Sequence, residues 1–333
     1  MKQAAYWDKL DGGKVGCRLC PHRCTIADGH TGLCGARANR EGVLYSEIYG
    51  QVTSVAMDPI EKKPLYHFCP GSNILSLGTR GCNFACQFCQ NWSISQERPH
   101  TTPLTSEAAV ATAQREGSVG IAYTYNEPLI WFEYVLDTAR LARQSGLANV
   151  LVSNGYAEPE PFAELLPFID AINMDIKSIR PEFYKRICRG SLEPVLANAA
   201  AAARATHLEI TNLIIPGHND SRDDLTDLAN WIADTLGPHT PVHLSAYFPR
   251  YKLQAAPTPP ETLEEAHAIF TARLHHVYLG NTHSKVGTDT LCRQCGAELI
   301  LRRGYATRVV GLKGSRCAAC GTDNNIVVQA GAS

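Results

Sequence analysis

The residues of this sequence best suited to chemistry are its cysteines, because eleven of the thirteen fall into three tight groups. Residues 1–16 lack the apolar stretch of a secretory signal, so we expect a cytoplasmic protein with reduced thiols rather than a disulfide framework. Closely spaced thiolates are typical ligands of metal ions and iron–sulfur clusters. The groups are Cys17, Cys20, Cys24 and Cys34; then Cys82, Cys86 and Cys89; and finally Cys292, Cys295, Cys317 and Cys320.

The middle group lies in the loop 78–91, where Cys82, Cys86 and Cys89 have the spacing C-x3-C-x2-C. Three thiolates can hold three irons of a [4Fe–4S] cluster and leave the fourth iron without a protein ligand. An open iron can bind a substrate or cofactor, whereas a cluster with four cysteine ligands only passes electrons. Zinc is the alternative, but no nearby residue offers the fourth ligand that a closed zinc site needs.

Short apolar runs alternate with helical segments between about residues 72 and 285. This repetition predicts a parallel sheet with right-handed crossovers, in a complete or partial β/α barrel or a doubly wound sheet. The clearest helix is expected after Ser221 and ends before Gly237. In either architecture the reactive residues belong in the loops after the strands. The expected strands are 74–78, 120–124, 149–153, 171–175, 207–215, 242–247 and 275–279.

The cysteine loop resembles that of radical SAM enzymes, whose C-x3-C-x-Φ-C motif matches Cys82, Cys86, Phe88 and Cys89. The resemblance implies a partial (β/α)6-type barrel and two cofactors, a [4Fe–4S] cluster and S-adenosyl-L-methionine. In that family the amino and carboxylate groups of S-adenosylmethionine chelate the open iron. Reduction of the cluster then cleaves the cofactor to methionine and a 5′-deoxyadenosyl radical, which abstracts a hydrogen atom.

Motifs after later strands make the sequence similar to the pyruvate formate-lyase activating-enzyme-like branch, and within it to the radical SAM enzyme of the AmmeMemoRadiSam system. The segment 124–128 stands where that branch has a Gly-Gly-Glu-Pro turn, so Glu127 is expected near the cofactor's amino group. Taken singly, Glu127 also fits a helix N-terminal carboxylate, and Lys177 fits a surface lysine paired with Asp175. We assign no catalytic residue beyond the cluster and cofactor ligands. The resemblance implies cofactor contacts from Phe88, Asn126, Glu127, Ser153, Asn154, Asp175 and Lys177.

The two terminal cysteine groups predict separate small modules organised by metals, over residues 1–71 and 286–333, on either side of a core at 72–285. The C-terminal group forms two C-x2-C-G knuckles, which favour a zinc ribbon over an iron centre or redox dithiols. The N-terminal group fits zinc or a second cluster. Its spacing is not that of a two-cluster ferredoxin, which favours a structural metal. Cys69 and Cys188 are expected to be buried small hydrophobes.

The composition excludes several classes of protein. The 44% of hydrophobic and 19% of charged residues rule out wholesale disorder, and no run approaches the roughly 18 apolar residues of a membrane span. With 31 basic and 32 acidic residues, bulk charge disfavours nucleic-acid binding. A local basic surface is nonetheless expected on the zinc ribbon, formed by Arg302, Arg303, Arg308, Lys313 and Arg316.

We therefore predict a radical SAM enzyme that abstracts hydrogen from a protein, as an activase of a glycyl-radical enzyme does, or from another substrate. The resemblance implies AMMECR-type and Memo-type partner proteins, and an electron donor such as a ferredoxin or flavodoxin. One alternative is a non-catalytic iron–sulfur electron carrier, for which Cys69 is the local candidate for a fourth cluster ligand. The other is a nucleic-acid-binding protein led by the zinc ribbon, whose affinity would depend strongly on salt.

Overall fold

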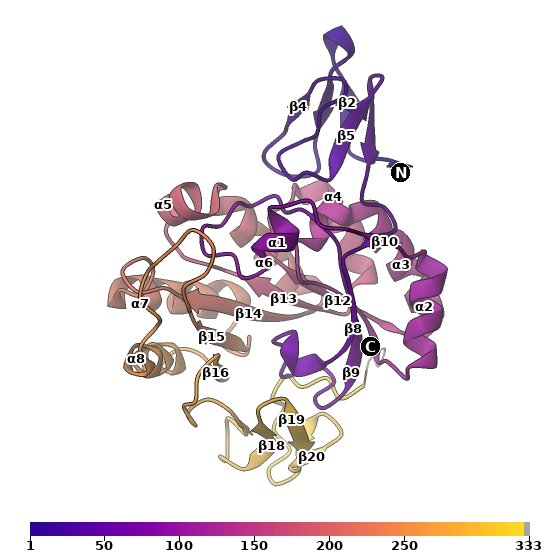
Figure 1. The fold of residues 1–333 in the computed structure, drawn as a ribbon. Coiled ribbons are helices and arrows are strands. Elements are labelled where there is room, and N and C mark those ends of the chain that lie inside the picture. Colours follow the sequence, from indigo (N-terminus) through magenta and orange to yellow (C-terminus); the bar gives the residue numbers. More distant parts are fainter. Residues whose placement is uncertain (330–333) are drawn as a thin grey trace.

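The core of the protein is an open sheet of eight strands in the order β16-β15-β14-β13-β12-β11-β9-β8. Figure 1 shows this sheet in a computed structural model, which describes residues 1–329. All neighbouring strands from β9 to β16 pair in parallel, which confirms the mostly parallel sheet. The parallel strands are β9 (Asn73–Gly78), β11 (Gly120–Tyr123), β12 (Ala148–Ser153), β13 (Ala171–Asp175), β14 (His207–Ile214), β15 (Val242–Ala246) and β16 (Val277–Gly280).

The edge strand β8 (Ser54–Pro59) pairs antiparallel with β9 and was not expected from the sequence. Its burial is the reverse of what side-chain polarity predicts, because the apolar residues Val55 and Met57 face solvent while the side chain of Asp58 is buried. Apolar alternation therefore does not reveal it. The sheet thus holds seven parallel strands, not the six of a (β/α)6-type barrel, and begins within the segment assigned to the N-terminal module.

Helices connect the parallel strands and pack against the sheet (Figure 1). The helix expected after Ser221 begins there, because the Ser221 side chain accepts a hydrogen bond from the Asp224 amide at 3.1 Å. It continues through a π-helical turn and stops at Gly237, whose φ is +105°. The α-helices are α1 (Trp92–Ser95), α2 (Ser106–Arg115), α3 (Phe132–Gln144), α4 (Pro159–Leu165), α5 (Pro181–Phe183), α6 (Glu193–Ala205), α7 (Arg222–Trp231) and α8 (Pro260–Thr271).

Small antiparallel sheets flank the core, and Figure 1 places the N-terminal and C-terminal ones at opposite ends of the molecule. None of the helices described is long and apolar enough to cross a membrane. Residues 330–333 of the expected C-terminal module lie outside the described part of the chain. The N-terminal strands are β1 (Lys2–Gln3), β2 (Trp7–Lys9), β3 (Val15–Cys17), β4 (Thr25–Ile26), β5 (Arg37–Arg40) and β6 (Val43–Ser46). Strand β7 (Gln51–Val52) pairs with β10 (Thr102–Pro103), and the C-terminal strands are β17 (Thr290–Leu291), β18 (Glu298–Arg303), β19 (Ala306–Val309), β20 (Leu312–Lys313) and β21 (Arg316–Cys317).

Arg302, expected on a basic surface, is one of the residues that attach the C-terminal sheet to the core, together with the contact between His67 and Asn324. Arg302 is instead only 3% exposed. Its guanidinium lies 4.1 Å from the ring centroid of Tyr66 and donates to the carbonyl of Tyr66 at 2.8 Å. The expected basic surface therefore loses one of its five charges, because that charge is used to hold the module against the core.

Candidate cofactor site

The loop that carries Cys82, Cys86 and Cys89 follows directly after β9 and turns back into the molecule. Two of its sulfur atoms have polar neighbours: the Phe84 amide donates to Cys82 Sγ at 3.3 Å, and Ser95 Oγ lies 3.2 Å from Cys89 Sγ. Cys86 is buried, and Cys82 and Cys89 are partly buried. Such N–H and O–H neighbours stabilise metal-bound thiolates and tune their electronic properties.

The spacing of these three sulfurs fits a cluster better than a single ion. The sulfurs of Cys82, Cys86 and Cys89 do not all lie within 4.8 Å of one another. Among residues 1–329, only the C-terminal cysteines form such a close group of ligand atoms. A cubane cluster places several irons and sulfides between its thiolates, so its cysteines must stand further apart than those around one zinc ion. The central loop therefore fits the predicted [4Fe–4S] cluster.

Cys188 joins this loop from a distant part of the chain, which the sequence analysis missed. It ends the π-helical turn Tyr184–Cys188 and is fully buried. A hydrogen bond from its side chain is the main reason that the pKa of Cys86 is lowered, and the charge of Lys177 lowers it further. The prediction that Cys188 is buried is confirmed, but only its tertiary position shows that it contacts a cluster ligand.

Cys69 lies elsewhere, which removes the local candidate for a fourth cluster ligand. It packs in a separate apolar group with Phe68 and Ile74, at the start of β9, whereas the cysteine loop follows the end of that strand. Its amide donates to the carbonyl of Val327 at 2.6 Å. Cys69 therefore cannot be the fourth cluster ligand that the electron-carrier alternative requires.

The carboxylate of Glu127, one of the predicted cofactor contacts, accepts three hydrogen bonds from the chain. Its Oε1 accepts hydrogen bonds from Ser153 Oγ at 2.7 Å and from the Leu129 amide at 2.9 Å, while Oε2 accepts from the Asn154 amide at 2.8 Å. The bond to Leu129 caps the 3-10 helix Pro128–Trp131, which confirms the helix N-terminal interpretation. Since each carboxylate oxygen accepts about two hydrogen bonds, one acceptor position on Oε2 is not used by the bonds described.

Burial raises the pKa of Glu127 to about 7, although the hydrogen bonds from Asn154, Leu129 and Ser153 act in the opposite direction. A carboxyl group whose pKa lies near neutrality can change its charge within the physiological range. Its affinity for a cationic group should therefore depend on pH.

Asn126 and Asn154 hold the cysteine loop in place. Asn126 Oδ1 accepts from the Thr79 amide and its Nδ2 donates to the Gly81 carbonyl, both at 2.9 Å. Asn154 Nδ2 donates to Asn83 Oδ1 at 2.9 Å and lies 3.8 Å from Cys82 Sγ. The structure thus gives both amides a role in positioning the cluster ligands.

Asp175 and Lys177 form an ion pair beside the same loop. Lys177 Nζ lies 3.0 Å from Asp175 Oδ2 and 5.6 Å from the ring centroid of Phe88. Burial lowers the pKa of Lys177, but the nearby charges of Asp175 and Cys86 outweigh burial and raise it overall. The lysine is largely buried, so it is not the surface lysine of the alternative interpretation. Asp175 is its partner, with about a third of its side chain exposed.

All seven predicted cofactor contacts therefore meet at one edge of the sheet, around the cysteine loop. Glu127, Ser153 and Asn154 form one network, and Asp175, Lys177 and Phe88 form another. Parallel strands end at a common edge, and this is where α/β proteins bind their ligands. The site is thus assembled from the loops after four neighbouring strands, β9, β11, β12 and β13.

Comparison with known proteins agrees with this geometry. Residues 76–232 match the family model of the radical SAM superfamily. The chain is also 44% identical over 336 residues to the uncharacterized protein MJ0808 of Methanocaldococcus jannaschii, covering 98% of this chain and 100% of that protein. The chain belongs to the radical SAM superfamily. It is accordingly an enzyme of that superfamily.

More distant relatives include activating enzymes. The pyruvate formate-lyase-activating enzyme of Listeria monocytogenes is 25% identical over 165 residues, which cover 46% of this chain and 66% of the relative. The (2S)-3-sulfopropanediol dehydratase activating enzyme of Klebsiella oxytoca is 28% identical over 125 residues, covering 37% and 39% of the two chains. These matches support the similarity of this radical SAM enzyme to the activase branch.

Solved structures show the same fold. A radical SAM methyltransferase from Sphaerobacter thermophilus superposes with a TM-score of 0.51 at 16% identity, over 64% of this chain and 68% of that one. SuiB of Streptococcus suis, bound to its precursor peptide SuiA, also gives a TM-score of 0.51, at 11% identity over 69% and 52% of the two chains. At these identities the superpositions establish the fold alone.

The C-terminal cysteines form a separate compact group that could hold a metal ion. Cys292 Sγ lies 3.6 Å from Cys320 Sγ, and Cys295 Sγ lies 3.7 Å from Cys317 Sγ. Metal–sulfur bonds of about 2.3 Å in a tetrahedron place the sulfurs about 3.8 Å apart. Burial raises the pKa of Cys292, but hydrogen bonds, led by those of the Cys295 and Gln294 amides, lower it to about 6. This cluster of four cysteines therefore fits one tetrahedral ion.

Proposed function

We propose that this enzyme holds a [4Fe–4S] cluster on Cys82, Cys86 and Cys89 and uses it to cleave S-adenosylmethionine. The observation that carries this proposal is the meeting of those three cysteines with the Glu127 network at one edge of the sheet. When bound, the cluster and cofactor supply an electron and a 5′-deoxyadenosyl radical, which abstracts a hydrogen atom from the substrate.

The residues around the loop each have a definite task in this proposal. Glu127 accepts a hydrogen bond from the cofactor's ammonium group through the free acceptor position on Oε2. The Lys177 and Asp175 pair offers a charged group of each sign to the polar parts of the cofactor. Phe88 is 4% exposed and provides an apolar wall that excludes water from a reactive radical. Asn126 and Asn154 keep the ligand-bearing loop in position.

The substrate class is a protein or a small molecule. The relatives named as activating enzymes support a protein substrate, as for an activase of a glycyl-radical enzyme. A GTP 3′,8-cyclase of Alkaliphilus metalliredigens, 27% identical over 161 residues that cover 46% of this chain and 50% of the cyclase, supports a small molecule. Similarity to the AmmeMemoRadiSam system adds AMMECR-type and Memo-type proteins as partners, with a ferredoxin or flavodoxin as electron donor.

Formation of 5′-deoxyadenosine tests the proposed reaction. The protein is reconstituted without oxygen with iron and sulfide, given S-adenosylmethionine and a strong reductant, and its products are separated by chromatography. We expect 5′-deoxyadenosine from the wild type and from Cys69→Ala, whose cysteine lies at the other end of β9, and none from Cys86→Ala. A wild type with a full cluster and no product would instead support an electron carrier.

We also propose zinc as the ion of the C-terminal cysteine group, because the observed sulfur spacings agree with tetrahedral zinc–sulfur geometry. Metal analysis of the purified protein should give about one zinc per chain. Cys317→Ala should lose this zinc and retain the iron of the reconstituted protein. Zinc retained by Cys317→Ala would contradict the assignment.

A further inference from the structure

The four N-terminal cysteines line a single small pocket. Cys17 ends strand β3 and is buried, while Cys20, Cys24 and Cys34 lie in the turns that follow and are partly buried. Four thiols that converge in this way from one small module are typical ligands of a bound metal centre. The remaining wall is mainly apolar and includes Leu19, Ile26, Leu33 and Ile130.

The spacing of the sulfurs distinguishes this site from the C-terminal one. No three of the four N-terminal sulfurs lie within 4.8 Å of one another, whereas all four C-terminal sulfurs do. The wider arrangement leaves room for several metal atoms between the thiolates, as in the loop of Cys82, Cys86 and Cys89. We propose that Cys17, Cys20, Cys24 and Cys34 bind a second [4Fe–4S] cluster and not a single zinc ion.

A buried arginine beside the cavity indicates that the occupant is negatively charged. Arg37 lines the cavity, is 1% exposed and forms an ion pair with Glu133 at 3.0 Å through Nη2. Its Nε and Nη1 have no hydrogen-bond partner among the residues described. Buried donors without partners are costly, and four thiolates carry more negative charge than a cluster core neutralises. A cluster in the cavity would thus compensate this guanidinium.

Backbone amides also point at the cysteines. The amide of Leu19 hydrogen-bonds to Cys17, and the amide of His22 hydrogen-bonds to Cys20. Amide donors of this kind surround iron–sulfur clusters and set their reduction potentials. The cavity therefore has both the ligands and the surrounding donors of a redox centre.

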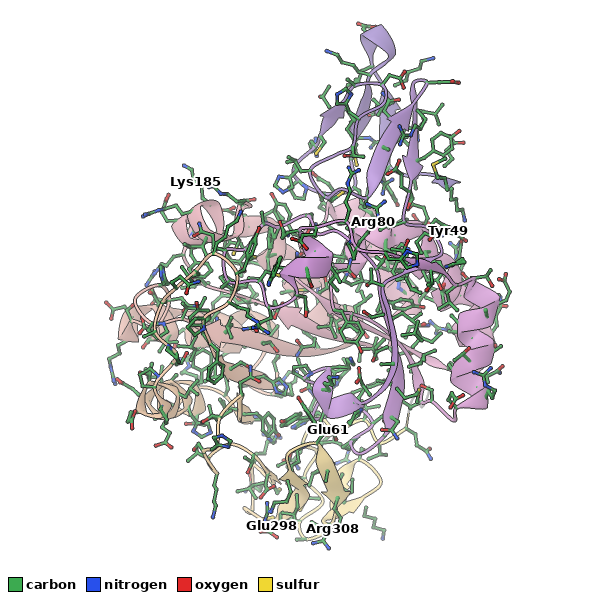
Figure 2. The ribbon with its side chains drawn as sticks, viewed as in Figure 1. Tyr49, Glu61, Arg80, Lys185, Glu298 and Arg308 are labelled. Carbon is green, nitrogen blue, oxygen red and sulfur yellow. The ribbon has the colours of Figure 1, made fainter. Side chains whose placement is uncertain are left out.

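The cavity lies directly beside the loop of the catalytic cluster. His22 Nε2 lies 2.7 Å from the carbonyl oxygen of Asn83, which is the neighbour of Cys82. A Cβ atom on Gly81 would stand only 2.3 Å from the carbonyl oxygen of Cys34, so the two ligand-bearing loops touch through their backbones. Arg80 donates to the Gly35 carbonyl at 3.0 Å, and Figure 2 shows it where the N-terminal module meets the core.

Because the two loops touch, the second cluster can pass electrons to the catalytic cluster. This relay role rests on the proposed function, since it requires a catalytic cluster on Cys82, Cys86 and Cys89. One electron passes from a low-potential donor protein of the ferredoxin or flavodoxin class to the N-terminal site, and from there to the catalytic cluster. Cleavage of one S-adenosylmethionine then consumes that electron, so one oxidised donor is produced for each cofactor cleaved.

Metal analysis tests the second cluster independently of activity. We compare the reconstituted wild type with a variant lacking Cys82, Cys86 and Cys89 and another lacking the four N-terminal cysteines, each replaced by alanine. We expect about eight irons in the wild type and about four in each variant. A variant without the central cysteines that holds a second zinc and no iron would overturn the proposal.

Spectroscopy of the wild type keeps the proposal falsifiable if either variant fails to fold. Electron paramagnetic resonance of the reduced protein should show two cluster signals, of which S-adenosylmethionine changes only one. A single signal, accounting for all the iron, would overturn the second cluster. Absence of 5′-deoxyadenosine with two signals present would refute the proposed function alone.

The relay is tested with two reductants. The variant without the four N-terminal cysteines should still cleave S-adenosylmethionine with dithionite, which reaches the catalytic cluster directly, but not with reduced flavodoxin. The Cys69→Ala variant should use both reductants and serves as the matched control. Retention of both reactions by the first variant, or loss of both, would overturn the relay role.

Discussion

Glu127 combines deep burial, three hydrogen bonds from the chain and a pKa near 7. The resemblance to the activase branch identified it in the sequence, because Glu127 stands where that branch has a Gly-Gly-Glu-Pro turn. Its spare acceptor position and the sharing of its two oxygens among three donors come only from the structure. These features make its charge the property to test.

Glu127 should make cofactor affinity depend on pH. Below its pKa of about 7 the carboxyl group is neutral and loses its attraction for an ammonium group, so affinity should fall as pH decreases. The wild type should weaken by up to about tenfold between about pH 8 and pH 6, relative to Glu127→Gln at the same pH. Equilibrium dialysis of S-adenosylmethionine with the reconstituted protein measures this ratio. The exposed Glu107→Gln variant is the control, and a ratio independent of pH would contradict the role.

Cys188 should tune the cluster through its hydrogen bond to Cys86. Removing a donor from a cluster thiolate makes the reduced cluster less stable, so Cys188→Ala should have a lower reduction potential. Cys188→Ser keeps a donor and should shift the potential less. A redox titration followed by electron paramagnetic resonance measures both. Equal potentials in the wild type and Cys188→Ala would show that the contact is structural only.

At the scale of elements, the strand–loop–helix units place each part of the site, and the loop after β9 depends on a glycine. Gly81 has a φ of +90° and touches the N-terminal module, whereas Gly217 has a φ of +75° and open space where a Cβ atom would lie. The two glycines thus share their backbone conformation and differ in their surroundings. This difference separates the effect of backbone strain from that of crowding.

Gly81→Ala should therefore destabilise the protein more than Gly217→Ala. The latter should lose about 1 kcal/mol from its positive φ, while Gly81→Ala should lose at least about 3 kcal/mol because the added methyl group also collides with Cys34. Denaturant unfolding of both variants under identical metal loading measures the difference. Equal losses would mean that the two loops separate without cost.

The sequence predicted the strands that have a local apolar pattern, but it did not predict the strand whose position depends on a neighbouring strand. The strands β9 and β11 to β16 lie within about two residues of their expected positions, because buried parallel strands are short apolar runs. Strand β8 was missed, since Val55 and Met57 face solvent and Asp58 faces inward. Its place in the sheet depends on the neighbouring β9, which no local pattern reports.

At the scale of the whole molecule, the small sheets that carry the N-terminal and C-terminal cysteines lie at opposite ends of the core (Figure 1). The N-terminal module touches the loop of Cys82, Cys86 and Cys89, while Arg302 is among the residues that hold the C-terminal module to the other end of the core. A buried arginine that stacks on an aromatic ring contributes through both its charge and its packing. The attachment of the C-terminal module should thus depend on this side chain.

Arg302→Ala should loosen the C-terminal module and leave its metal in place. Loss of the stacking on Tyr66 and of the buried hydrogen bonds should cost about 2 to 4 kcal/mol. Hydrogen exchange should become faster in β18, while the zinc content stays unchanged. The exposed neighbour Arg303 provides the matched control, since Arg303→Ala should change stability by less than about 0.5 kcal/mol. Unchanged exchange in Arg302→Ala would show that other contacts attach the module.

The sequence by itself determined which chemistry is present, because metal-binding motifs and alternating strands and helices are encoded over short stretches of chain. It identified the three cysteine groups, the parallel sheet and the edge at which Glu127, Asn154 and Lys177 would meet. Only the tertiary structure decided that Cys188 lies beside Cys86, that Arg302 is buried, and that the backbone of Cys34 touches Gly81. These contacts join residues far apart along the chain, so their positions depend on how the whole sheet packs and not on any local pattern.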